Sequence, residues 1–415
     1  MGPVPGADAD VLVIGGGVIG LSIAWRAAQQ GLRVILADPQ PGQGATHAAA
    51  GMLTPVAEAA YAERELFALG RDSLSRYPAF AAELEQASGL PTGFRQTGTL
   101  QVAYDHDDLA VLDELAALQD SFGVRTRPMT ARECREAEPM LDPSVVGGLL
   151  ATDDGSVDPR LLAQALLRAA TAAGAAHFPV AVAELRTGTG RVTGAVLADG
   201  GQVTASQVVL AAGWQSAGLA GLACGLPVRP VKGQIIRLRG GGTGLPPGLL
   251  QRTVRGIVRG SSVYLVPRES GELVIGATQE EMGADTTVTA GGVWQLLRDA
   301  RTLVPGITEL ALTDAVAGLR PGTPDNAPVL GPASLSGLVL ATGHFRAGVL
   351  LAPVTADTVA HYLRTGIKDP LWAAFGPDRF GRAAAAPPGQ SRQPATEAVP
   401  AAAARVSPRG RNAGT

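Results

Sequence analysis

Three glycines near the N-terminus have the spacing of a phosphate-binding loop. Gly15, Gly17 and Gly20 form a Gly-x-Gly-x-x-Gly pattern directly after the β-branched run 10–14. The first glycine permits a tight turn, the second lets the backbone approach a pyrophosphate, and the third lets helix and strand pack closely. Asp38 follows eighteen residues after Gly20, where an acidic side chain can bind ribose hydroxyls. The pattern predicts a dinucleotide site.

Other polar residues give no metal or nucleophile pattern. Ser22 and Ser156 lack the context of a nucleophile elbow. Asp153 and Asp154 are adjacent carboxylates, but neighbouring residues point apart, so we expect a solvated turn there. The histidines outside the late glycine-rich segment are scattered and have no metal-ligand spacing: His47, His106, His177 and His361.

The elements around the glycine loop must form a β-α-β unit. Asp10 to Ile14 is a short strand, an apolar-periodic helix runs to Gln30, and Leu32 to Ala37 is a second strand. Helices are predicted at about 61–88, 107–122 and 159–173, strands within 180–212, and strand–helix character again at 337–364. Between them, 228–317 is β-rich, with strands at 233–239, 263–267 and 273–277 and a helix near 291–304.

Composition limits the class of protein. The chain has 415 residues, 46% hydrophobic and 17% charged, which is enough for a large core and suggests two domains. A net charge of −3 argues against a nucleic-acid partner. Cys134 and Cys224 give no disulfide framework, which suggests a reducing cytoplasm. The apolar run 11–25 is too short and too rich in glycine to span a membrane, and no signal peptide is visible.

The choice of dinucleotide depends on glycine-rich segments elsewhere. The motif alone does not separate NAD from FAD. Small residues recur at 44–52, just after the β-α-β unit, and at 340–348, where a helix is expected to begin. Backbone from both segments can wrap a long ligand, and a helix N-terminus can stabilise an anionic reduced flavin. These segments favour FAD.

Four segments together resemble the FAD-dependent D-amino-acid oxidase superfamily, and within it the glycine oxidases of thiazole biosynthesis. They are 15–20, 45–52, Gly318-Leu-Arg-Pro-Gly322 and Gly343-His-Phe-Arg-Ala-Gly348-Val-Leu-Leu-Ala-Pro353. The similarity runs from about Asp8 to Phe380. It implies an α/β (α+β) fold: a Rossmann-like FAD-binding domain from 8–88, 144–226 and 318–380, interleaved with a mainly antiparallel substrate domain from 89–143 and 227–317. Residues 1–7 and 382–415 are expected to be disordered tails.

The resemblance also implies which residues bind FAD. Beside the loop glycines Gly15, Gly17 and Gly20 they are Val18, Ile19, Asp38, Pro39, Ala45, Thr46, Ala50, Gly51, Met52, Val182, His344, Phe345, Arg346, Ala347, Gly348, Val349 and Leu350. The register at Val182 is open, because Val180 is close enough to take its place. Monomeric sarcosine oxidases hold flavin through a late cysteine, and this chain has none after Cys224. A noncovalent flavin is therefore expected.

Substrate contacts carried over from the family are Arg320, Arg346 and Tyr264. An arginine fork can hold a carboxylate through two parallel hydrogen bonds. Flavin chemistry needs no side-chain base if the amine binds neutral, so we assign no catalytic residue beyond these positioning groups. At Ser262 and Gln279 family members often carry His and Met, so side-chain selectivity can differ.

The implied activity is oxidation of glycine and other small amino acids, such as sarcosine or D-amino acids, with oxygen as acceptor. A sarcosine oxidase or D-amino-acid dehydrogenase of the same superfamily is the alternative. A flavin subunit without catalysis, or a folate-dependent tRNA methylase, belongs to another class, and the near-neutral charge disfavours the methylase. The family also suggests a homotetramer.

Overall fold

The glycine motif lies where strand β1 (Ala7–Ile14) passes into helix α1 (Val18–Gln29). The structure is a computed structural model that describes residues 7–222, 225–240 and 248–384. The two tails expected to be disordered fall almost wholly outside these residues. The residues of each tail that adjoin the folded part differ from the expectation. Ala7 begins strand β1, and residues 382–384 belong to the 3₁₀ helix η5 (Pro377–Ala384).

A first sheet carries the glycine loop. Within the described residues it has eight strands in the order β17-β18-β11-β1-β2-β8, with the β9–β10 hairpin attached to β11. The five strands from β18 to β8 are parallel. The strands are β1, β2 (Val34–Ala37), β8 (Ala176–Phe178), β9 (Val182–Gly188), β10 (Arg191–Leu197), β11 (Gln202–Leu210), β17 (Val329–Pro332) and β18 (Leu338–Thr342). Such strands are buried on both faces, which explains the unbroken apolar run at 11–14.

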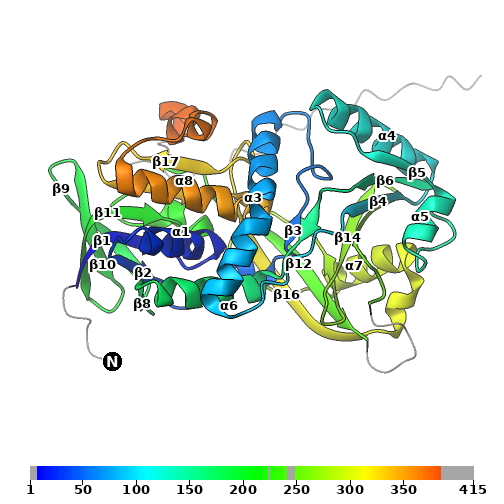
Figure 1. Ribbon diagram of the computed structural model, residues 1–415, viewed down its shortest axis with the longest axis horizontal. Helices are drawn as coiled ribbons and strands as arrows, with labels where there is room; N and C mark the ends of the chain where they lie inside the picture. The colour runs from blue at the N-terminus through cyan, green and yellow to red at the C-terminus, as the bar shows by residue number, and fades with distance from the viewer. Residues whose placement is uncertain (1–6, 223–224, 241–247, 385–415) are drawn as a thin grey trace, which may run out of the picture.

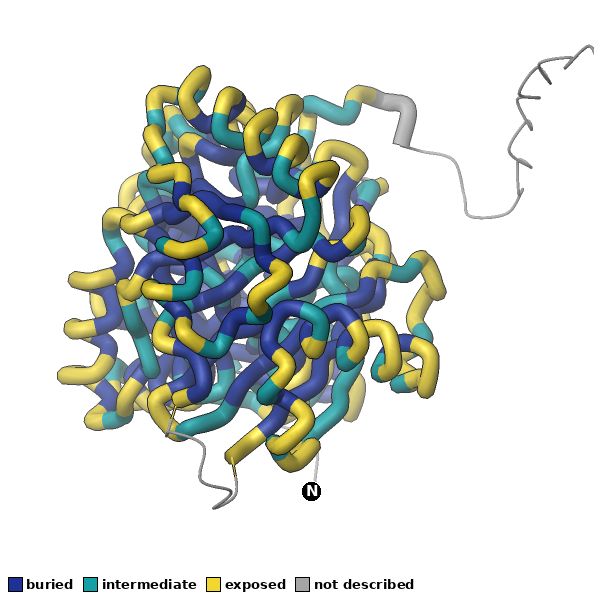
Figure 2. The backbone as a smooth tube through the Cα atoms, turned by 90° about the vertical axis from the view of Figure 1, so that its right-hand side faces the viewer, coloured by how far each residue is buried: buried dark blue, intermediate teal, exposed yellow. Residues whose placement is uncertain are grey.

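Helices cover one face of this sheet. Helix α1 packs between α6 (Pro159–Ala172) and α8 (Ala352–Thr365), and α3 (Arg64–Ser88) crosses both (Figure 1). Helix α6 starts where Asp158 caps the amides of Arg160 and Leu161, with Pro159 in the first turn. Figure 2 shows that the buried segments run through the interior while exposed ones form outer turns and helix faces.

A second sheet lies beyond α3 on the right of Figure 1. Its order is β16-β12-β15-β14-β13-β4-β6-β5, and all pairs are antiparallel except β4 with β13. The strands are β4 (Thr99–Ala103), β5 (Arg127–Thr130), β6 (Gly147–Ala151), β12 (Arg229–Arg239), β13 (Thr253–Val258), β14 (Ser261–Pro267), β15 (Glu272–Gly276) and β16 (Ala311–Gly322). Helices α4 (His106–Ser121), α5 (Ala131–Ala137) and α7 (Ala290–Leu303) pack on it. The two sheets confirm the predicted fold class.

The strand pairing differs from the expected segment boundaries at two places. We expected 144–226 and 318–380 to join the glycine-loop domain. Strand β6 instead pairs with β4 and β5, and the end of β16 pairs with β12. Residues 147–151 and 318–322 therefore belong to the second sheet, because the backbone hydrogen bonds of a strand decide which sheet it joins.

Two short elements connect the halves. Helix α2 (Ala45–Ala48) is followed by strand β3 (Met52–Leu53), which pairs with β7 (Gly155–Ser156) in a small ribbon.

In the described part of the chain, no helix is both long and apolar enough to serve as a membrane span.

Candidate cofactor and substrate site

One cavity of about 660 Å³ runs from the glycine loop to the face of the second sheet. That volume lies in the range of small-molecule and cofactor sites, about 300–1,000 Å³. The predicted cofactor and substrate residues that line it are Gly15, Gly17, Val18, Ile19, Asp38, Ala45, Thr46, Ala50, Gly51, Met52, Tyr264, Arg320, His344, Phe345, Arg346, Gly348 and Val349.

Five predicted residues do not line the cavity. Pro39 is exposed in the turn after β2, and Val182 packs against the apolar cluster under β9 and β10. Ala347 and Leu350 are buried in the core beside α1 and α3. Gly20 lies in the first turn of α1, facing the carbonyl of Gly15.

The glycine-loop end has the form of a dinucleotide cradle. Gly15 has φ +101°, a conformation that only glycine adopts readily. The Gly16 amide donates to Oδ2 of Asp38 at 2.6 Å, so this carboxylate also fixes the loop. The Val18 amide donates to Oγ1 of Thr46 at 3.0 Å, which joins α1 to α2. Bare backbone faces the cavity here, and the residues present fit the phosphates and ribose of a dinucleotide.

The sequence reasoning missed a second group at this end. Ala211, Ala212, Gly213, Trp214 and Gln215 line the cavity after β11. Strand β11 is parallel to β1, so both strands end at the same edge of the sheet, where ligands of such folds bind. The run Ala-Ala-Gly directly after an apolar strand was the available signal.

At the other end, two glycines make room for the predicted substrate residues. A Cβ on Gly233 would lie 2.3 Å from Nη1 of Arg320, so the guanidinium lies flat against this glycine of β12. A Cβ on Gly276 would lie 2.4 Å from the Tyr264 hydroxyl, so the phenol crosses this glycine of β15. Since β12 and β15 are neighbours, the two polar groups extend toward each other.

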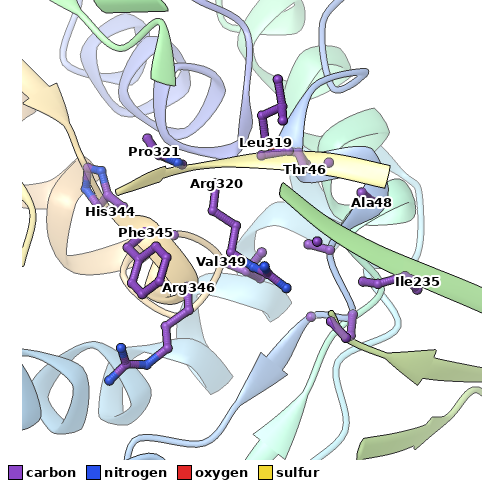
Figure 3. Close-up of a pocket in the computed structure, with 18 of the residues that line it drawn as sticks. Thr46, Ala48, Ile235, Leu319, Arg320, Pro321, His344, Phe345, Arg346 and Val349 are labelled. Atoms are coloured by element: carbon purple, nitrogen blue, oxygen red, sulfur yellow. The ribbon is translucent and has the colours of Figure 1, made fainter. Parts of the chain in front are cut away.

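The three arginines that line the cavity differ in their partners. Arg346 pairs with Glu63, and its Nε lies 3.7 Å from Glu58. Arg255 donates to Glu58 at 2.6 Å. Arg320 donates to the carbonyl of Thr278 at 3.2 Å, and among the described residues it has no carboxylate within 4.0 Å. Figure 3 shows Arg320 projecting into the cavity and Arg346 extending away from it.

The local environment sets the charge of two further groups. Burial raises the pKa of Tyr264, and the nearby positive charge of Arg320 opposes this only in part, so the phenol stays protonated and can donate. His344 is buried, with Nε2 3.2 Å from Oγ1 of Thr355. Burial lowers the pKa of His344 to about 3. The imidazole is therefore neutral near pH 7, and its place at the cavity wall contributes no charge.

The late glycine-rich segment does not open a helix as expected. Gly343 and Phe345 have φ +72° and +45°, which interrupts any continuous helical run. A short 3₁₀ turn covers Phe345–Ala347, and α8 begins only at Ala352. The residues of this segment that line the cavity therefore do so from a turn that precedes the helix.

Asp154 corrects the expectation of a solvated turn. Asp153 is exposed and pairs with Arg71 at 3.2 Å, but Asp154 is fully buried. Its carboxyl accepts from the amides of Val56 and Ala57, at 3.4 and 3.3 Å, in the loop that carries Glu58. Burial raises the pKa of Asp154 to about 8, although these amides oppose the shift.

We expect Asp154→Asn to change how stability depends on pH. The wild-type carboxyl is protonated when folded and ionised when unfolded between about pH 4 and 8, so unfolding releases a proton and stability falls as pH rises. From pH 5 to 7 the wild type should lose about 1–3 kcal/mol of unfolding free energy relative to Asp154→Asn. Urea unfolding at three pH values measures this, with exposed Asp153→Asn as control. Parallel pH profiles for wild type and Asp154→Asn would contradict the burial argument.

Comparison with known proteins agrees with this geometry. The family model described as "FAD dependent oxidoreductase" matches residues 10–362. The bifunctional protein ThiO/ThiG of Synechocystis sp. is 37% identical over 95% of this chain, which spans 57% of that relative. The glycine oxidase of Geobacillus kaustophilus is 35% identical over 85% of this chain and 92% of its own length. The crystal structure of glycine oxidase from that organism matches with a TM-score of 0.82 at 33% identity, over 89% of this chain and 98% of the other.

These findings confirm the family, the cofactor and the class of protein expected from the sequence. The matched region contains the glycine loop, both sheets and the residues of the cavity. The chain spans a little over half the length of the bifunctional relatives and nearly all of the glycine oxidase. The protein is an enzyme that uses FAD and belongs to the FAD-dependent oxidoreductase family.

Proposed function

We propose that the protein oxidises glycine and other small amino acids, among them sarcosine and D-amino acids. The amino acid loses a hydride and a proton to become an imine, which water hydrolyses to a 2-oxo acid and ammonia. With glycine, oxygen and water consumed, the products are glyoxylate, ammonia and hydrogen peroxide. Relatives named glycine oxidase, at 33–35% identity over 85% of the chain, support this reaction.

The observation that carries the proposal is the unpaired charge of Arg320. Among the arginines at the cavity it alone has no carboxylate partner in the described residues. A half-buried guanidinium without a counter-ion is a receptor for one carboxylate, held by two charge-assisted hydrogen bonds. The protonated phenol of Tyr264 extends toward the same space and supplies a further donor.

Orientation is the main contribution of the protein to the reaction. FAD, when bound, would provide the acceptor for the hydride and the means of returning the electrons to oxygen. Arg320 and Tyr264 hold the carboxylate, which fixes the α-carbon relative to the wall formed by Ala50, Gly51 and Met52. His344, which also lines the cavity, is a neutral imidazole and adds no charge to it. Proton loss from the amine to solvent before binding removes the need for a side-chain base.

The individual cofactor contacts are part of the proposal. The cavity-lining residues of the glycine loop, of 45–52 and of 344–349 would hold FAD without a covalent bond, and Cys134 is buried in the second core away from the cavity. Residues Gly20, Ala347 and Leu350 would act by packing behind these segments. We assign the first sheet and its helices to an FAD-binding domain and the second sheet to a substrate domain.

The biological role follows from the named relatives. ThiO/ThiG proteins join this type of chain to a second part, and a supply of iminoglycine or glyoxylate for thiazole synthesis fits that pairing. We further propose that the protein acts in the cytoplasm as a homotetramer.

A peroxide assay tests the proposed reaction. Purified yellow protein is given glycine, sarcosine, D-alanine and D-proline, with the L-forms of alanine and proline as controls, while oxygen uptake and peroxide are followed. We expect peroxide with glycine and sarcosine and none with L-amino acids. Anaerobic bleaching of the flavin without peroxide in air would instead indicate a dehydrogenase, and no bleaching with any of them would reject the substrate class.

A further inference from the structure

The charges at the substrate end of the cavity are almost balanced without a ligand. Arg255, Arg320 and Arg346 line this end together with Glu58, and Glu63 pairs with Arg346 from behind. Two of the three arginines are thus neutralised by two glutamates. Asp38, the other acid that lines the cavity, lies at the glycine-loop end. One positive charge remains, and it is that of Arg320.

The surrounding titratable groups do not change this count. His344 is neutral near pH 7, because burial lowers its pKa to about 3. Asp154, which contacts the loop carrying Glu58, has its pKa raised by burial to about 8 and adds no full negative charge there. Tyr264 remains a neutral phenol.

The Arg255–Glu58 pair lies directly beside the proposed carboxylate site. Arg255 on β13 is opposite Tyr264 on β14 in the strand pairing, which places their Cβ atoms about 5 Å apart. Nη1 of Arg255 donates to Glu58 at 2.6 Å and lies 3.7 Å from Sδ of Met52, on the wall where the flavin is expected. In the strand order, β16 with Arg320 and β13 with Arg255 lie on opposite sides of β14 with Tyr264. A substrate substituent that passes Tyr264 on the side away from Arg320 would therefore meet this pair.

We infer that Glu58 is a specificity-determining residue that restricts the enzyme to amino acids with a single carboxylate. Neutral N-substituents are accepted, because they bring no additional charge to the Arg255–Glu58 pair, whose charges already balance. A second carboxylate is rejected, because Arg255 is already neutralised and Glu58 repels the new charge at close range. The inference rests on the proposed function and deepens it by naming the substrate class.

The test compares two compounds of nearly the same shape that differ by one charge. Iminodiacetate carries two carboxylates, and its monoamide, N-(carbamoylmethyl)glycine, carries one. Binding is read from the change in flavin absorbance, which does not need turnover, and initial peroxide rates are measured in parallel. We expect the wild type to bind the monoamide about 10- to 100-fold more tightly than the diacid.

Glu58→Gln should move this ratio in favour of the diacid by about 10-fold or more, because Arg255 then lacks its counter-ion. Glu58→Asp, which keeps the charge, should retain the preference for the monoamide. Glu281→Gln is the matched control. This substitution also removes the carboxylate of a glutamate–arginine pair, because Glu281 lies 3.0 Å from the guanidinium of Arg229. Glu281, however, does not line the cavity.

The outcomes separate the inference from the proposed function. Equal or tighter binding of the diacid by the wild type would overturn the role of Glu58, as would a ratio that Glu58→Gln and Glu281→Gln change equally. The wild-type comparison stands even if a variant fails to fold. Absence of peroxide with glycine and sarcosine would instead reject the proposed reaction, whatever the two compounds do.

Discussion

Replacing Arg320 with Met should lower kcat/KM for glycine by about 30- to several-thousand-fold, equivalent to roughly 2–5 kcal/mol. The methionine fills similar space on Gly233 but leaves the substrate carboxylate without its counter-ion. The loss should be partly recovered in Arg320→Lys, which keeps the charge but cannot form two parallel hydrogen bonds. Steady-state kinetics with glycine and sarcosine measure both effects.

Two controls assign this loss to the carboxylate. The amount of FAD retained on purification should be unchanged in Arg320→Met, because no described contact joins Arg320 to the glycine-loop end. Arg229→Met removes an arginine from the same strand pair, where Arg229 is opposite Gly322 and binds the exposed Glu281. It should retain near-normal kcat/KM. Equal losses in Arg229→Met and Arg320→Met would mean that the effect is a general disturbance of the sheet, and unchanged turnover in Arg320→Met would show the anchor to be wrong.

The glycine-loop half of the fold was predictable because its signals are local. Strand, glycine turn, helix and second strand follow within residues 7–37, and each is buried as its apolar pattern indicates. The strands β4, β5 and β6 were not predicted. They are short, and β4 is stabilised by pairing with β13 about 150 residues later, which no pattern within 99–103 reveals.

The site was predictable only where a motif carried it. Arg320 was identified because it lies in the segment Gly318-Leu-Arg-Pro-Gly322, which resembles the family. The pair of Arg255 and Glu58 did not, because its members are 197 residues apart and neither lies in a motif. Asp154 shows the same limit at short range. Asp154 is buried and Asp153 is not, because the chain enters β7 next to the loop at 56–57. This is a tertiary contact, and the local sequence around the two residues does not indicate it.

Cofactor binding should respond most strongly to Gly20, although this residue does not touch the cavity. A Cβ at Gly20 would lie 1.9 Å from the carbonyl oxygen of Gly15. The oxygen belongs to the backbone and the position of a Cβ is fixed by the backbone, so no side-chain rotation can relieve this contact. Gly20→Ala must therefore push the start of α1 away from the end of β1, and Gly15 and Gly17 move with it. Such overpacking costs about 1–3 kcal/mol. The FAD-free loop can open and relieve this cost, but FAD binding requires the closed loop, so the affinity for FAD should fall about 5- to 150-fold.

The measurement is FAD retained on purification and the dissociation constant from flavin fluorescence. Gly291→Ala is the matched control, since Gly291 also lies in a helix but has no atom within 4 Å of an added Cβ. This control should keep its FAD and gain thermal stability, because alanine favours helix over glycine by about 1 kcal/mol. Full FAD occupancy in Gly20→Ala would show that the loop tolerates a wider turn. In that case close packing of α1 on β1 would not be what shapes the cradle, and the amide of Gly16 held by Asp38 would be left as the main constraint on it.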